Sequence, residues 1–212
     1  MRSCMVNNSF FKRLLSVAAA LMIMASSAEA TEKEAMNFIN DLAERAIDIV
    51  KKKDLNDDVK EKRLTEIFLV SVDTQFIGKF SMGRYWRTIN PVQQAQYLKL
   101  YSQYLTGMYV PNFKKYTGNN VVKVLDAKKV RENEYFVQTE IDSGSGANNI
   151  QINYMLRQDP KGIEKFIIFD IIAEGVSLIT SQRSEIGSIM DDGGFDHLIS
   201  LLNRKIETPA AS

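Results

Sequence analysis

The sequence predicts an α+β domain with N-terminal helices, a four-stranded curved antiparallel sheet, and C-terminal helices that enclose an apolar cavity. Three observations lead to this prediction. Apolar residues recur at spacings of three and four between residues 32 and 110, they alternate with polar residues between 121 and 174, and helical spacing returns after Gly175. No internal repeat or linker separates these parts, so we expect a single domain.

Residues 1–30 have the pattern of a secretory signal peptide. Basic residues precede an apolar stretch from Leu14 to Ala25, and Ala28-Glu29-Ala30 has the small-x-small form of a cleavage site. The apolar stretch is shorter than the roughly 20 residues that cross a bilayer, so we expect cleavage after Ala30 rather than an anchor. The chain then divides into a signal peptide at 1–30, a single domain at 31–206 and a frayed tail at 207–212.

Charge and cysteine content exclude several classes of protein. The only cysteine, Cys4, lies in the signal peptide, so the exported chain has no disulfide, thiol nucleophile or thiolate metal site. The signal peptide carries three basic residues and one acidic residue, so cleavage changes the net charge from +1 to about −1. This balance argues against nucleic-acid binding and against a polybasic membrane anchor. A bacterial periplasm suits such a chain.

Three amphipathic helices are expected before the sheet. The first spans Glu32 to Lys52, and the second follows the polar break from Lys53 to Asp58. The third begins with Asn90 as N-cap and Pro91 as first helical residue, and it should end near Val110 because Pro111 disturbs it. Its apolar stripe is either core or the mouth of a pocket; it contains Tyr97, Tyr101, Tyr104 and Met108.

Four strands are expected, at Val121 to Val130, Tyr135 to Asp142, Asn149 to Gln158 and Glu164 to Glu174. The second and third alternate, which gives the sheet one apolar face. The fourth differs, because Phe166 to Ile172 carry apolar bulk on both sides. Helices can cover one side, and we expect a bound apolar ligand to cover part of the other. Helices should then span Val176 to Ile189 and Phe195 to Ile206, separated by Gly193-Gly194.

Catalytic and metal-binding motifs are missing from the sequence. The single histidine, His197, has no serine or acid at a recognisable spacing, and there is no HExxH, GxSxG or Walker motif. The glycine-rich segment Gly144-Ser145-Gly146 joins two strands and is interpreted as a hairpin loop. We therefore expect no metal, no cofactor and no catalytic residue.

One acid stands out, because Asp170 lies in an apolar strand and is costly to bury without a partner. Its expected partner is either the backbone or a cation, with Arg84, Arg87 and Arg183 as candidates. A second hypothesis is a pocket enzyme in which Asp170 acts as general base and Tyr154 polarises a carbonyl.

Two groups of residues resemble the toluene-tolerance or MlaC family of periplasmic phospholipid-binding proteins. The first is Gly83-Arg84-Tyr85-Trp86-Arg87 followed by Pro91, Gln93 and Gln94. The second runs from Asp170-Ile171 through Glu174-Gly175-Val176-Ser177-Leu178 to Arg183-Ser184, Gly193, Leu198-Ile199 and Leu202. In order and spacing the similarity covers about residues 38–202. The chain departs from the family pattern at Val72-Asp73-Thr74, at Ile186 and at Phe166 to Ile168, which leaves the size and headgroup of the lipid open.

The resemblance implies a soluble, monomeric shuttle that performs no chemistry and maintains the lipid asymmetry of the outer membrane. It would exchange phospholipid between an outer-membrane lipoprotein complex and an inner-membrane ABC transporter with a lipid-binding ring protein. A hopanoid-type carrier and an adaptor in envelope assembly remain alternatives. Arg84, Arg87 and Arg183 would either contact a lipid phosphate or form structural ion pairs. The cavity wall is predicted to contain Phe76, Phe80, Tyr101, Leu105, Met108, Val137, Thr139, Ile141, Ile152, Tyr154, Leu156, Val176 and Leu178.

Overall fold

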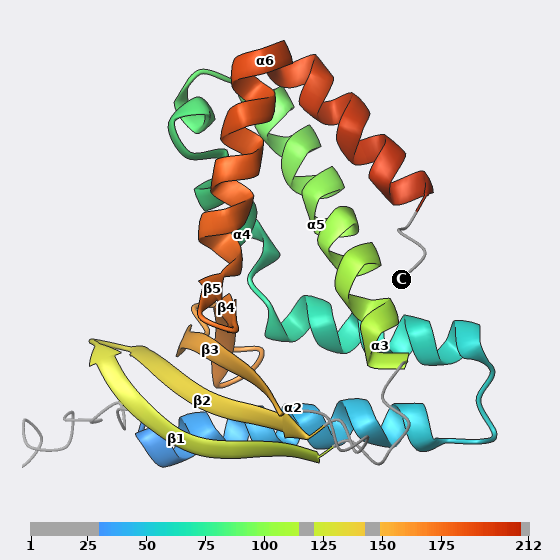
Figure 1. Ribbon diagram of the computed structural model, residues 1–212, viewed down its shortest axis with the longest axis vertical. Coiled ribbons are helices and arrows are strands. Elements are labelled where there is room, and N and C mark those ends of the chain that lie inside the picture. The colour runs from blue at the N-terminus through green and yellow to red at the C-terminus, as the bar shows by residue number, and fades with distance from the viewer. Residues whose placement is uncertain (1–29, 115–120, 143–148, 209–212) are drawn as a thin grey trace, which may run out of the picture.

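The predicted order of helices, antiparallel sheet and helices is confirmed by a computed structural model, which describes residues 30–114, 121–142 and 149–208 (Figure 1). The predicted signal peptide therefore lies almost entirely outside the described residues, as does the glycine-rich loop at 144–146. The elements are α2 (Glu32–Lys51), α3 (Asp57–Ser71), α4 (Thr74–Met82), the 3₁₀ helix η1 (Gly83–Arg87), α5 (Pro91–Lys114), β1 (Val121–Arg131), β2 (Glu134–Asp142), β3 (Ile150–Gln158), β4 (Phe166–Ala173), β5 (Val176–Ser177) and α6 (Leu178–Glu207).

The strands form one antiparallel sheet in the order β1-β2-β3-β4-β5. The four predicted strands are present, and the fifth was not predicted. Glu174 and Gly175 both have positive φ, at 48° and 79°, and they turn the chain so that Val176 pairs with Ala173. Val176 is therefore a strand residue and not the start of a helix, and α6 begins at Leu178 with Ser177 as its N-cap.

A β-bulge interrupts β4, the strand that is apolar on both sides. Leu156 of β3 pairs with Ile168, whereas the preceding residue Met155 pairs with Asp170, so Phe169 is the extra residue on β4. A bulge shifts the alternation by one position, so Ile168 and Ile171 face the same side of the sheet although their numbers differ by three. The ring of Phe169 instead packs edge-on against Phe76 of α4.

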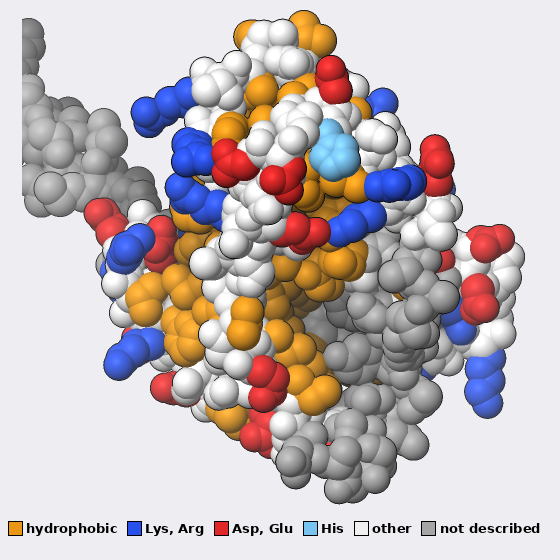
Figure 2. All heavy atoms as spheres, turned by 45° about the horizontal axis from the view of Figure 1, so that its top comes forward, with side chains coloured by type: hydrophobic (Ala, Val, Ile, Leu, Met, Phe, Trp, Pro, Cys, Tyr) orange, Lys and Arg blue, Asp and Glu red, His pale blue; other side chains and the backbone are white. Residues whose placement is uncertain are grey.

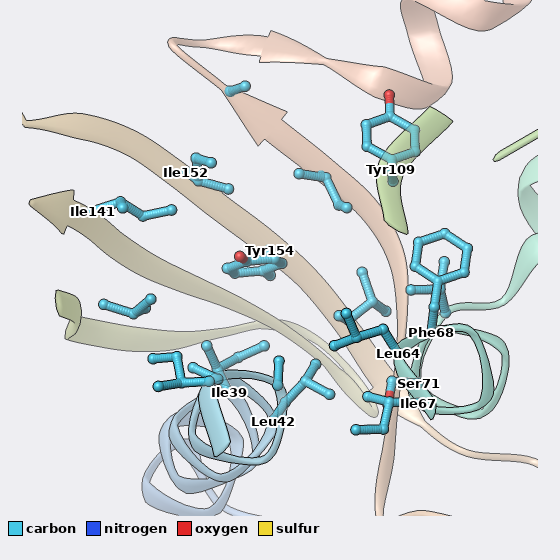
Figure 3. A pocket seen from close by; sticks show the side chains of 18 of the residues that line it. Ile39, Leu42, Leu64, Ile67, Phe68, Ser71, Tyr109, Ile141, Ile152 and Tyr154 are labelled. Carbon is cyan, nitrogen blue, oxygen red and sulfur yellow. The ribbon is translucent and has the colours of Figure 1, made fainter. Parts of the chain in front are cut away.

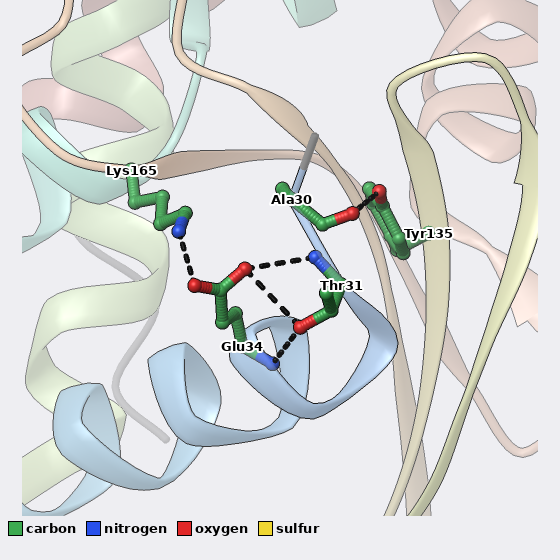
Figure 4. A network of polar contacts seen from close by, with 5 residues as sticks. All are labelled: Ala30, Thr31, Glu34, Tyr135 and Lys165. Carbon is green, nitrogen blue, oxygen red and sulfur yellow. Dashed lines mark hydrogen bonds and ion pairs between the residues drawn. The ribbon is translucent and has the colours of Figure 1, made fainter. Parts of the chain in front are cut away.

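Helix α2 lies along one face of the sheet beside β1 and β2 (Figure 1). Its N-terminus is fixed by a capping box (Figure 4). The backbone N–H of Thr31 donates to the Glu34 carboxylate at 2.8 Å, and the backbone N–H of Glu34 donates to the Thr31 hydroxyl. The same carboxylate pairs with Lys165, and the hydroxyl of Tyr135 donates to the carbonyl of Ala30. The cap therefore attaches α2 to the sheet.

Helices α4, α5 and α6 pack together and rise away from the sheet (Figure 1). Helix α5 continues through Pro111 to Lys114, so the predicted end at Val110 is wrong. The proline lacks the N–H that would bond to the carbonyl four residues earlier, and only three helical residues follow it. Helix α6 bends at Gly194, whose φ of 70° and ψ of −164° are non-helical, close to the predicted break. None of the described helices is long and apolar enough to span a bilayer.

Candidate functional site

A cavity of about 310 Å³ lies between α2, α3 and the sheet, and it falls at the small end of the size range of ligand pockets, roughly 300–1,000 Å³. Figure 3 shows α2 beneath it, α3 and Tyr109 of α5 on one side, and β2 and β3 on the other. Its lining consists almost wholly of hydrocarbon side chains: Ile39, Leu42, Ala43, Ala46, Ile47, Val50, Leu64, Ile67, Phe68, Ser71, Val72, Tyr109, Val122, Ile141, Ile152, Tyr154, Ile168, Ile171 and Ala173.

The helical part of this lining follows from the 3.6-residue period. On α2 the side chains at positions 39, 42, 43, 46, 47 and 50 share one face, and on α3 those at 64, 67, 68 and 71 do so. The sheet contributes through cross-strand neighbours, since Tyr154 is opposite Ile171 and Ile152 is opposite Ala173. The apolar faces of the helices and the sheet thus face each other without filling the space between them.

The cavity has a buried end and a more exposed end. Leu64, Phe68, Val72 and Ile168 are buried, whereas Ala173 at the end of β4 is exposed and Ile152 is half-buried. Apolar side chains also reach the surface across the middle of the face shown in Figure 2, with charged side chains mainly around them.

Three hydroxyl groups interrupt the apolar lining, those of Ser71, Tyr109 and Tyr154. The ring of Tyr109 stacks on Phe68 with 6.4 Å between ring centroids. Burial raises the pKa of Tyr109 to about 12, because a phenolate would lose its hydration. The described lining contains no acid, base or cation, so its chemistry is suited to holding an apolar group and not to proton transfer.

The structure places three of the residues predicted for the wall in this lining, namely Ile141, Ile152 and Tyr154. Three more are buried in the sheet on the same face without lining the cavity: Val137, Thr139 and Leu156. Five lie on α4 and α5, among the helices that rise from the sheet: Phe76, Phe80, Tyr101, Leu105 and Met108. Of the last two, Val176 is 60% exposed on β5 and Leu178 is half-buried at the start of α6.

Tyr101 shows what the tyrosine stripe of α5 does. Its ring packs between Tyr97 and Tyr104, and its hydroxyl lies 3.3 Å from that of Ser81 and 3.4 Å from the amide oxygen of Gln182. Burial raises its pKa well above the ordinary value. The stripe therefore belongs to the contact of α4, α5 and α6. Among the described side chains of α5, Tyr109, one residue beyond the stripe, is the one that reaches the cavity.

The three predicted arginines lie outside the cavity lining. Arg84 pairs with Asp191 at 2.7 Å and contacts the hydroxyl of Tyr85, which itself donates to Asp191. The Tyr85 hydroxyl, and then Arg84, hold the pKa of the Asp191 carboxyl below its usual value. Arg183 lies over the ring of Phe80 at 4.9 Å from its centroid.

Asp170 does not pair with any of these arginines among the described contacts. Its carboxylate accepts hydrogen bonds from the hydroxyl of Ser177 at 2.6 Å and from the backbone N–H groups of Ile171 and Ile179 at 2.9 and 3.0 Å. Of the two expected kinds of partner, the backbone is observed, and the Ser177 hydroxyl is a third kind that was not expected. The carboxylate joins β4 to the N-terminus of α6, where the helix dipole favours an anion.

Most of the lining residues that sequence reasoning missed lie on α2 and α3. Their apolar faces were visible as periodic patterns, and the position that carries Ser71 follows the same period. Nothing in such a pattern tells a face that packs against side chains from one that borders an empty space. In the described part of the chain no cluster of His, Cys, Asp and Glu is arranged to hold a metal ion.

Comparison with known proteins assigns the family. The model of the MlaC family, described as MlaC protein, matches residues 40–204. The chain belongs to the MlaC family. This match includes every residue of the cavity lining except Ile39, and it extends into the second half of α6. It confirms the resemblance seen in the sequence.

Two relatives illustrate this membership. The Intermembrane phospholipid transport system binding protein MlaC of Haemophilus influenzae is 19% identical over 139 residues, which are 65% of this chain and 64% of that protein. The structure of a phospholipid-binding protein from Ralstonia solanacearum, in complex with a phospholipid, superposes with a TM-score of 0.68 at 16% identity, over 82% of this chain and 97% of that one. The second likeness shows that the chain has the MlaC-like fold.

Proposed function

We propose that this MlaC-family chain is a periplasmic lipid carrier that holds phospholipid acyl chains in the cavity between α2, α3 and the sheet. The observation that carries the proposal is the lining itself, which is apolar, partly open and free of ionisable groups other than two tyrosines. Each buried CH₂ contributes about 0.8 kcal/mol, so shelter for one acyl chain gives tight capture without a specific polar contact.

The comparisons support a carrier and not an enzyme. The relative in Haemophilus influenzae is named for phospholipid transport, and the Ralstonia solanacearum structure contains a phospholipid. We propose that the chain exchanges lipid with an outer-membrane lipoprotein complex and with an inner-membrane ABC transporter carrying a lipid-binding ring protein. In this way it would maintain the lipid asymmetry of the outer membrane.

Export follows from the same proposal. If the signal peptide is removed after Ala30, Tyr135 loses its acceptor on Ala30, and the pair of Glu34 with Lys165 still joins the cap to the sheet. The new amino terminus is then Thr31, whose nitrogen lies 2.8 Å from the Glu34 carboxylate. The ammonium group would then take part in the cap of α2 as an ion pair. Intact-mass measurement of the exported protein tests this site: a mass that begins at Thr31 supports it, and a retained N-terminal segment contradicts it.

The test of the carrier function is organic extraction of the purified protein followed by mass spectrometry. A carrier should yield about one phospholipid per chain, and a protein that is consistently empty would contradict the proposal. If the extract contains a hopanoid instead of a phospholipid, the ligand belongs to the alternative class. Ile152→Glu places a charge in the lining and should abolish the bound lipid, whereas an adaptor without a ligand would keep its activity in this variant.

A further inference from the structure

The hydroxyl of Ser71 is the most deeply placed polar group of the cavity. Ser71 is the last residue of α3, it is 0% exposed, and its side chain is part of the cavity lining (Figure 3). Its Oγ has no hydrogen-bond partner among the residues that the structure describes. An unsatisfied buried hydroxyl costs free energy, so a group that persists in this state calls for a partner that binds there.

The usual partner of a helical serine is absent. Serine and threonine in helices often donate to the carbonyl one turn earlier, as Thr106 does on α5, where its hydroxyl donates to the carbonyl of Ser102 at 2.8 Å. Ser71 makes no such bond. Its donor is therefore available on the cavity side of α3.

A trapped water is a poor partner for this hydroxyl. A buried water needs two to four polar neighbours, and the other α3 side chains that line the cavity are hydrocarbon, namely Leu64, Ile67 and Phe68. The other two hydroxyls of the lining belong to Tyr109 and Tyr154, and Figure 3 shows both of them well apart from Ser71. A water at this end would have Ser71 as its only side-chain partner in the lining.

We infer that Ser71 forms a polar subsite for a lipid whose buried apolar part carries an oxygen function, a hydroxyl or a carbonyl, at the point that reaches the C-terminus of α3. This inference rests on the proposed carrier function, since it specifies the ligand of the same cavity. A plain hydrocarbon chain fills the space but leaves the Ser71 hydroxyl unsatisfied. A chain with an oxygen at the right depth satisfies it while keeping its other contacts.

The test uses a series of lysophospholipids of equal acyl-chain length, one unsubstituted and the others hydroxylated at successive carbons from the middle to the end of the chain. Their dissociation constants are measured by competition with a fluorescent lipid, for the wild type and for Ser71→Ala. The matched control is Ser81→Ala, which removes a buried hydroxyl on α4 that does not line the cavity. One good hydrogen bond corresponds to roughly a fivefold change in affinity.

In the wild type, the lysophospholipid hydroxylated at one particular carbon should bind with a dissociation constant at least about fivefold lower than those hydroxylated elsewhere. It could even bind more tightly than the unsubstituted lipid. Ser71→Ala should remove this advantage, and Ser81→Ala should retain it. If hydroxylation has the same effect at every position, or if Ser71→Ala retains the advantage, the subsite is refuted. Failure of the unsubstituted lipid to bind the wild type would instead contradict the carrier function, so the two proposals fail in different ways.

Discussion

The hydroxyl of Ser177 donates a hydrogen bond of 2.6 Å to the carboxylate of Asp170 across the turn between β4 and β5. This contact fixes the point at which the sheet passes into α6, because the same carboxylate accepts from the backbone N–H of Ile179 in the first turn of that helix. The acid that looked most like a catalyst in the sequence thus has its lone pairs engaged in holding two elements together.

Asp170→Ala should therefore destabilise the protein without abolishing lipid binding by the folded fraction. Three donors lose their acceptor, and one of them belongs to a helix N-terminus, so we expect the free energy of unfolding to fall by about 2–3 kcal/mol. Urea denaturation measures this change. The exposed Asp192 of α6 provides the control, since Asp192→Ala should change stability by less than about 0.5 kcal/mol. Equal midpoints for the two variants would contradict the anchoring role.

Arg157 connects the sheet to α4. It pairs with Asp73, the N-cap of α4, and its guanidinium lies 4.4 Å from the ring centroid of Phe76 and 5.8 Å from that of Phe169. A lysine keeps the charge but loses the planar stacking, so Arg157→Lys should cost about 1–2 kcal/mol of stability.

The control for this substitution is Arg45→Lys, which alters the more exposed pair of Arg45 with Glu164 at 2.9 Å. Exposed ion pairs contribute little, so thermal and urea unfolding should barely change. If the two lysine variants are equally stable, the stacked geometry of Arg157 makes no contribution.

Tyr109 predicts an alkaline loss of stability. Its pKa is raised to about 12 in the folded protein, above the unfolded value of about 10. The neutral phenol is thus favoured by folding, so the stabilisation is complete below pH of about 10 and is lost as pH rises toward about 12. Tyr109→Phe should flatten the stability profile in this range. A bound lipid should raise the titration midpoint of Tyr109 further. Ultraviolet absorbance of the phenolate, compared between the wild type and Tyr109→Phe, measures this midpoint with and without lipid. A Tyr109 that titrates near pH of about 10 would contradict its burial.

Filling the cavity should remove the lipid. Ala46 is buried on α2 and lines the cavity, so Ala46→Phe places a ring where an acyl chain would lie. Ala95→Phe makes the same change at an exposed position on α5. Native mass spectrometry should show lipid bound to Ala95→Phe and at least a tenfold lower occupancy in Ala46→Phe, consistent with the loss of several buried CH₂ contacts. Equal occupancy would mean that the lipid binds elsewhere.

Much of the fold could be predicted from the sequence because alternation and helical spacing are local properties. The four strands, the helix that begins at Pro91 and the break near Gly194 all follow from such patterns. The two-residue strand at Val176 could not be predicted, since it depends on the turn conformation of Glu174 and Gly175. The bulge at Phe169 is equally hidden, because it appears only when β4 is paired with β3.

The cavity could be predicted less well than the fold. Ile141, Ile152 and Tyr154 were identified because a sheet with one apolar face produces alternating apolar and polar residues along its strands. Tyr101 and Leu105 carry the same kind of pattern, yet they pack between helices. Which apolar face meets another face and which borders a space is decided by tertiary packing, so the α2 and α3 sides of the lining required the structure.

The most direct test of the proposed site is photo-crosslinking with a phospholipid that carries a diazirine on its acyl chain, followed by peptide mapping. If the cavity holds the chain, adducts should form on α2, α3 and the cavity-facing residues of β3 and β4, with Ala46, Ile67 and Ile171 among them. Adducts confined to α4, α5 before Tyr109, or α6 would contradict this assignment of the site.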